Sequence, residues 1–281
     1  MNHPSQPLIT LIALLLSTSL FAADPPPVVK TSPPSAATAE KVLKDSPRHG
    51  EWVDVPMPGS EVKLHSWIVY PERSDKAPVV IVIHEIFGMS DWVRATTDQL
   101  AAEGFIAVAP DLLSGFGPNG GGTESFKADA MRDAFRKLTA DETAKRLDAV
   151  RDYAIALPSA TDRTGTIGFC WGGGASFAYA AHQPKLNAAV VFYGTPPAKE
   201  TLANIACPVY GFYGKDDNRV TSTVEPTKQA MSALNKPYEP HIYEGAGHGF
   251  MRQQDGRDGA NQKAADAAWP QAIGFLKNHL K

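Results

Sequence analysis

The sequence repeats one unit several times: a short run of β-branched and other apolar residues, followed by a stretch with the spacing of an amphipathic helix. Residues 78–83 (Pro-Val-Val-Ile-Val-Ile) are typical of a strand that is covered on both faces, and residues 91–103 follow with apolar side chains at helical intervals. Strands that alternate with helices are joined by right-handed crossovers, which produce a mostly parallel sheet with helices on both faces. The predicted fold is therefore α/β and doubly wound.

The same alternation continues to the end of the chain. Ahead of it, residues 51–70 alternate in part between apolar and polar side chains, which predicts an N-terminal antiparallel hairpin with one partly solvated face. One domain is expected over residues 40–281. Its further strands are predicted at 105–109, 164–168, 188–193, 209–213 and 238–243, and its further helices at 141–157, 172–182, 222–234 and 261–280.

The first 39 residues differ in composition from the rest. Residues 1–23 contain an uncharged apolar stretch, Leu8 to Leu20, and end on small residues, which predicts a secretory signal peptide and an exported, periplasmic or secreted protein. An uncleaved membrane anchor or a misassigned start codon is the alternative, because no Lys or Arg precedes the stretch. Residues 24–39 are rich in Pro, Ser, Ala and Thr, which predicts a disordered tether.

The charge, the cysteines and the glycine-rich stretch exclude several classes of partner and of protein. The net charge is -3, with both signs scattered along the chain, so neither nucleic acid nor stable membrane insertion after signal cleavage is expected, and a small molecule is the expected partner. Of the two cysteines, Cys207 lies in an apolar run and is predicted to be buried. No Cys-x-x-Cys pair is present, which argues against a thiol redox protein. The glycine-rich stretch 115–122 lacks the residue order of a phosphate loop and is predicted to be a surface loop.

The other cysteine, Cys170, lies where a predicted buried strand turns into a helix. Its surroundings, Gly168-Phe169-Cys170-Trp171-Gly172, match the nucleophile-elbow pattern Gly-x-Ser-x-Gly with Cys in place of Ser. Glycines two positions before and after the nucleophile allow strand and helix to approach closely. The amino end of the helix also favours a thiolate. We therefore predict that Cys170 is a nucleophile, the alternative being a buried structural cysteine.

A nucleophile of this kind needs an imidazole base and a carboxylate that orients it. In elbow-type hydrolases these groups follow the nucleophile in the order acid, histidine, each on a loop after a strand. His248 lies among glycines after the strand predicted at 238–243, and Asp216 and Asp217 follow the strand at 209–213. We predict His248 as the base and favour Asp217 as the acid, while either aspartate could instead cap the turn that follows.

Several motifs of the chain occur together in one known family. They resemble those of the dienelactone hydrolase (carboxymethylenebutenolidase) family of the α/β-hydrolase superfamily, and the resemblance extends from about residue 50 to the end of the chain. It supports Asp217, because the acid of the family lies three residues before a valine and Val220 is at that distance. The motifs are His84 to Gly88, Ala109 to Leu112, Gly168 to Gly173, Phe192 to Gly194 and Gly245 to Phe250.

The resemblance implies roles for residues outside the Cys-His-Asp set. The glutamate at the position of Glu85 holds the resting cysteine as a thiol and is displaced when substrate binds; the alternative is a buried carboxylate paired with a cation. The backbone N–H groups of Ile86 and Trp171 correspond to the oxyanion hole. Arg252 corresponds to an arginine that recognises a substrate carboxylate. Arg132 is the nearest candidate for a second such arginine, or else an ordinary solvated helix charge.

The resemblance therefore implies a hydrolase that cleaves small lactones or carboxylic esters, anionic ones where Arg252 takes part, through a cysteine acyl-enzyme. It implies no cofactor and no metal. Two alternatives remain: an exported carboxylesterase of broad specificity without dienelactone activity, and a non-catalytic binding protein with the α/β-hydrolase fold. The sequence does not predict the oligomeric state.

Overall fold

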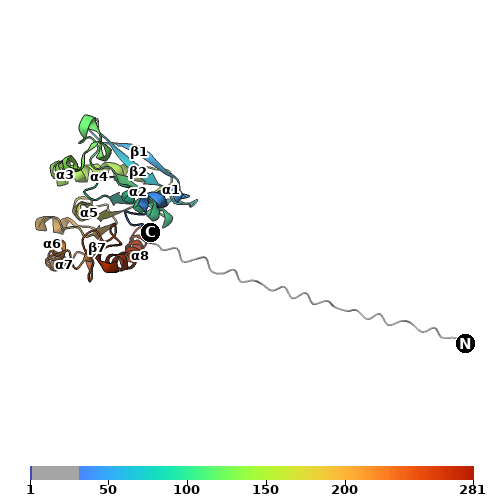
Figure 1. Cartoon of the computed structure of the whole chain (residues 1–281). Helices are drawn as coiled ribbons and strands as arrows, with labels where there is room; N and C mark the ends of the chain where they lie inside the picture. Colours follow the sequence, from blue (N-terminus) through green and yellow to red (C-terminus); the bar gives the residue numbers. More distant parts are fainter. Residues whose placement is uncertain (2–31) are drawn as a thin grey trace. The chain divides into compact units, whose positions relative to one another are not determined.

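The computed structural model describes residues 32–281 together with Met1 (Figure 1). The predicted signal peptide and the tether up to residue 31 lie outside the described residues, apart from Met1. No helix of the described part is both long and apolar enough to cross a membrane.

One eight-stranded sheet forms the centre of the domain, in the order β1-β2-β4-β3-β5-β6-β7-β8. The hairpin β1-β2 is antiparallel, β2 pairs antiparallel with β4, and all later pairings are parallel, which confirms the predicted sheet. The strands are β1 Gly50–Pro56, β2 Lys63–Val69, β3 Ala77–Ile83, β4 Ile106–Pro110, β5 Ala160–Phe169, β6 Ala188–Phe192, β7 Val209–Gly214 and β8 Tyr238–Tyr243.

Helices cover both faces of this sheet, as Figure 1 shows. The α-helices are α1 Ala39–Asp45, α2 Asp91–Ala102, α3 Ala128–Lys137, α4 Ala140–Ile155, α5 Trp171–His182, α6 Asn218–Thr221, α7 Val224–Ala233 and α8 Ala260–His279. Short 3-10 turns are η1 Pro118–Gly120, η2 Thr123–Ser125, η3 Lys199–Asn204 and η4 Arg257–Gly259.

The continuous apolar run of β3 explains why a hydrophobic layer packs on each face of the sheet. Successive side chains of a strand point to opposite faces, so a strand covered on both sides must be apolar throughout. Ile81 and Ile83 belong to one hydrophobic cluster with side chains of α4, α5 and α7, whereas Val80 and Val82 belong to another with side chains of α1, α2 and α8. All four side chains are fully buried. β5, which pairs with β3, therefore lies in the same sheet between these two hydrophobic layers.

The segment that precedes α1 is ordered where the composition predicted a tether. The indole Nε1 of Trp92 donates to Pro34 O at 2.9 Å, and Nε2 of Gln254 donates to Pro33 O at 2.8 Å. The backbone N–H of Ala36 donates to Arg252 O at 2.9 Å. The part of the predicted tether from residue 32 onward thus lies against the domain. Its order comes from donors on the domain, which the composition of the segment does not reveal.

Three helices, α1, α3 and the four-residue α6, were not predicted. The short α3 and the glycine-rich loop before it form a small separate hydrophobic cluster, in which Phe135 packs against Ile86 and Trp171. The loop is anchored by Thr123, whose N–H and hydroxyl both donate to the buried carboxylate of Asp111. This cluster places α3 beside the elbow of Cys170.

Candidate active site

Cys170 occupies the sharp turn between β5 and α5. Its backbone has φ 57° and ψ -118°, in the positive-φ region that non-glycine residues rarely adopt. A Cβ atom on Gly168 would lie 1.9 Å from Gly172 O, and a Cβ atom on Gly172 would lie 2.3 Å from Ile83 O. Only glycine fits at both positions. The pattern of glycines around Cys170 therefore has the steric cause that the sequence predicted.

Cys170, His248 and Asp217 come together in space. Nε2 of His248 lies 3.0 Å from Sγ of Cys170, and Nδ1 of His248 lies 2.5 Å from Oδ2 of Asp217. The Asp217 side chain is 7% exposed. Asp216 points elsewhere and accepts a hydrogen bond from Arg257 at 2.9 Å in an exposed ion pair. The structure thus places Asp217, and not its neighbour, at the imidazole.

The imidazole of His248 is strongly basic in this setting. Burial lowers its pKa, but the hydrogen bonds to Asp217 and Cys170 and the attraction of both groups outweigh burial, and the pKa rises from 6.5 to about 9. A protonated His248 donates Nδ1–H to the carboxylate and Nε2–H toward the sulfur. The imidazolium thus presents a hydrogen-bond donor to the sulfur of Cys170, which lies at the amino end of α5.

Glu85 and Arg252 form the second charged pair of the site. Nε of Arg252 donates to Oε2 of Glu85 at 2.6 Å, and the two side chains are 21% and 3% exposed. Burial raises the pKa of Glu85, and Arg252 opposes that shift. The expected contact of Glu85 with the thiol is not present: His248 is the neighbour of the sulfur, and the carboxylate takes the guanidinium. A buried carboxylate gains more from a cation than from a neutral thiol, which explains the difference.

Only Nε of the Arg252 guanidinium is engaged by Glu85. Its guanidinium carbon lies 4.5 Å from the ring centre of Phe87, an exposed aromatic side chain. Within the described chain, its terminal nitrogens make no hydrogen bond. The predicted contact with a substrate carboxylate can therefore use these nitrogens while Nε stays on Glu85.

The backbone N–H groups of Ile86 and Trp171 are both without an acceptor in residues 32–281. Trp171 is the first residue of α5, where an N–H has no partner inside the helix. Ile86 lies in the turn after β3, and both side chains are partly exposed. Trp171 directly follows Cys170, and Ile86 packs against the same small hydrophobic cluster as Trp171. Two unpaired N–H donors are the groups that the predicted oxyanion hole requires.

Arg132 does not lie among the residues of the candidate site. It lies on the exposed side of α3, and we observe no ion pair or side-chain hydrogen bond for it in the described residues. The alternative of a solvated helix charge describes its surroundings.

Tyr193 entered the sequence analysis only as part of the motif Phe192 to Gly194 and was given no role at the site. The ring of Tyr193 lies 5.1 Å from that of His248, and its backbone has a positive φ of 41°. Tyr193 is fully buried, and its hydroxyl makes no well-formed hydrogen bond within residues 32–281. Its position at the carboxyl end of β6 was the available signal, because parallel strands bring those ends together.

Known proteins resemble this chain over most of its length. The family model of the dienelactone hydrolase family matches residues 64–280. A protein of Escherichia coli strain K12 described as "Putative carboxymethylenebutenolidase" is 30% identical over 236 residues, which cover 79% of this chain and 85% of that protein. A protein of Synechocystis with the same description is 30% identical over 244 residues, 81% of this chain and 96% of that protein.

Solved structures agree with these relatives. The crystal structure of a "Putative Dienelactone Hydrolase" from Klebsiella pneumoniae superposes with a TM-score of 0.72 at 28% identity, covering 82% of this chain and 98% of that one. This similarity, together with the parallel sheet and the elbow at Cys170, confirms the predicted α/β-hydrolase fold. The chain belongs to the dienelactone hydrolase family, a family of hydrolases.

Proposed function

We propose that this protein hydrolyses small carboxylic esters and lactones through a thioester on Cys170. The observation that carries the proposal is the continuous contact from sulfur to imidazole to carboxylate, 3.0 Å and 2.5 Å long, at a strained elbow. Such an order of nucleophile, base and orienting acid serves nucleophilic catalysis and has no use in a binding protein.

The proposed reaction begins with the thiolate of Cys170. The sulfur attacks the carbonyl carbon, and the N–H groups of Ile86 and Trp171 receive the oxygen that becomes negative. As the tetrahedral intermediate collapses, the C–O bond breaks and protonated His248 gives its proton to the leaving alkoxide. Neutral His248 then removes a proton from water, which attacks the thioester and releases the acid. Asp217 keeps the imidazole oriented in both halves.

The pair of Glu85 and Arg252 supports a preference for anionic substrates in this proposal. A substrate carboxylate would meet the free terminal nitrogens of Arg252, next to the aromatic ring of Phe87. With Glu85 held by Arg252, its carboxylate does not compete for the sulfur. The relatives described as carboxymethylenebutenolidases lend weight to an anionic lactone as substrate.

A comparison of the two cysteines tests the proposal. We expect Cys170→Ala to lose at least about 10³-fold in kcat/KM with a p-nitrophenyl ester and with an anionic enol-lactone, since the nucleophile is removed. Cys207→Ala is the matched control. Cys207 is buried in the other hydrophobic cluster from Cys170, so this variant should keep the wild-type turnover. Mass spectrometry of the wild type during turnover should detect an acyl adduct that Cys170→Ala lacks. Unchanged turnover in Cys170→Ala would refute the mechanism, and activity on the aryl ester alone would indicate a general carboxylesterase.

A further inference from the structure

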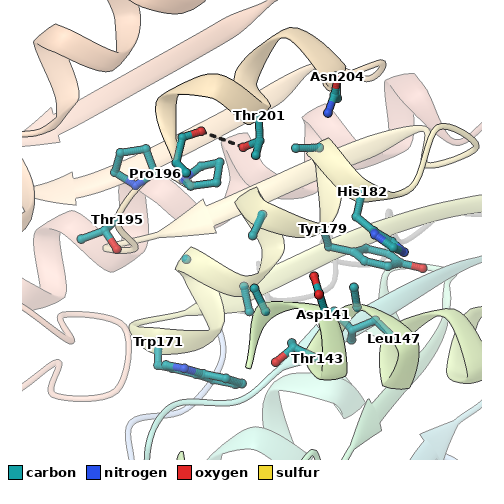
Figure 2. A pocket seen from close by; sticks show the side chains of 18 of the residues that line it. Asp141, Thr143, Leu147, Trp171, Tyr179, His182, Thr195, Pro196, Thr201 and Asn204 are labelled. Atoms are coloured by element: carbon teal, nitrogen blue, oxygen red, sulfur yellow. Dashed lines mark hydrogen bonds between the residues drawn. The ribbon is translucent and has the colours of Figure 1, made fainter. Parts of the chain in front are cut away.

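A groove of about 530 Å³ lies beside the proposed catalytic centre and is not part of it. Its floor is the outer face of α5, and its walls are the first half of α4 and the segment from Thr195 to Asn204 (Figure 2). Cys170, His248 and Asp217 do not line it. The reaction proposed above therefore leaves this groove without a role.

The groove begins at the elbow. Trp171, whose N–H is one of the two proposed oxyanion donors, lines one end of it, and Thr195 lines the other side of that end (Figure 2). Gly174, one helical turn after Cys170, lies next to Thr195: a Cβ atom on it would be 3.3 Å from Thr195 O. The far end is marked by His182, the last residue of α5. Trp171, the residue directly after Cys170, thus marks the end of the groove that is nearest to the elbow.

The floor of the groove is apolar, and it remains partly exposed. Its residues are small and leave a channel along a helix that is about 18 Å long for its 12 residues. The charged groups near the far end are paired, since Asp148 accepts hydrogen bonds from Tyr179 and Gln183 and contacts His182. No basic residue other than His182 lines the groove. The floor residues are Gly174, Ala175, Ala178 and Ala181.

The position of His248 decides which half of an ester would occupy the groove. His248 lies on the loop after β8. The same loop packs Phe250 and Met251 into the hydrophobic layer that contains side chains of α1, α2 and α8. The groove belongs to the opposite layer, with α4 and α5. The leaving alcohol must accept its proton from His248 and so departs on that side. The acyl group, which stays bound to the sulfur, is the half that extends toward Trp171.

We propose that this groove binds the acyl chain of the substrate, so that among esters with uncharged acyl groups the enzyme prefers medium-length alkyl chains to acetyl. The inference rests on the proposed function. Each methylene buried against an apolar floor contributes about 0.8 kcal/mol, which corresponds to at most about a fourfold gain in kcat/KM. Asp141, an exposed carboxylate on the wall, disfavours a second negative charge at the distal end of the chain.

A series of p-nitrophenyl esters from acetate through butyrate, hexanoate and octanoate to decanoate tests the groove, at concentrations below micelle formation. The wild type should gain about two- to fourfold in kcat/KM per methylene over part of the series. Ala178→Leu fills the groove and should lower the ratio of octanoate to acetate kcat/KM at least about tenfold. Ala181→Leu, further along the floor, should lower the decanoate ratio more than the butyrate ratio. Ala267→Leu, on an exposed face of α8, is the matched control and should keep the wild-type ratios.

The outcomes separate this inference from the mechanism. If acetate is hydrolysed by the wild type and not by Cys170→Ala, but kcat/KM does not rise with chain length, the groove is not an acyl site and the proposed function stands. The same holds if Ala178→Leu and Ala267→Leu give equal ratios while both remain folded by circular dichroism. If kcat/KM is higher for decyl acetate than for ethyl acetate, but no higher for p-nitrophenyl decanoate than for p-nitrophenyl acetate, the groove binds the alcohol half and the assignment to the acyl half is wrong. If no ester in the series is hydrolysed, both the proposed function and this inference are refuted.

Discussion

Two neighbouring aspartates at the end of β7 differ only in what their side chains meet. Asp217 is buried against His248, whereas Asp216 is paired with Arg257 in solvent. We expect Asp217→Asn to lower kcat for a p-nitrophenyl ester by about 10⁴-fold, because the amide stabilises the wrong imidazole tautomer and removes the charge that supports the imidazolium. Asp216→Asn should remain within about twofold of the wild type. Equal losses in the two variants would contradict the assignment of Asp217.

The raised pKa of His248 links the site to stability. Burial lowers this pKa, but the hydrogen bonds to Asp217 and Cys170 prevail, so the folded protein binds the proton up to about pH 9 and the unfolded chain only to about 6.5. The stabilisation is complete below pH 6.5 and is lost as the pH rises through 9. Urea unfolding across this interval should therefore show the wild type losing stability relative to His248→Ala. A difference that is constant or grows with pH would refute the pairing.

Among the secondary-structure elements, the junction of β5 and α5 places the strictest limit on side-chain size. A Cβ atom on Gly168 would lie 1.9 Å from a backbone oxygen, which cannot move without displacing the helix. We expect Gly168→Ala to cost at least about 3 kcal/mol in the free energy of unfolding. Gly274→Ala in α8 is the matched control, since nothing lies within 4 Å of the added methyl group, and it should gain about 0.5 to 1 kcal/mol. Thermal denaturation of both variants measures the contrast.

In the whole domain, residues 33–38 connect parts that are distant in the chain. They accept hydrogen bonds from Trp92 and Gln254, and Ala36 donates to the carbonyl oxygen of Arg252. Removal of residues 1–38 should therefore lower the melting temperature and raise KM for an anionic ester, because the loop that holds Arg252 loses a support. Removal of residues 1–31 keeps these bonds and serves as the control. If both truncated proteins behave alike in differential scanning calorimetry and in KM, the segment has no such role.

The sequence by itself determined the succession of strands and long helices along the chain, because the alternation of apolar residues is a local property that records which faces are covered. From β3 onward the predicted bounds lie within two residues of the observed ones, except that β5 begins at Ala160 and not at residue 164. The sequence also placed Cys170, Asp217 and His248 at the carboxyl ends of strands, where a parallel sheet gathers them. The signal peptide over residues 1–23 stays a prediction, since it lies outside the described residues save Met1.

Only the tertiary structure decided which groups face one another. The contact of His248 with Asp217, which the sequence favoured over Asp216 without showing it, depends on segments far apart in the chain. The pairing of Glu85 with Arg252 instead of the thiol and the order of residues 33–38 depend on such contacts too. So does the groove along α5, which exists because α4 and the segment after β6 leave its small-residue face uncovered. Periodicity records burial, but pairing energies are set by distance and direction, and these exist only once the chain is folded.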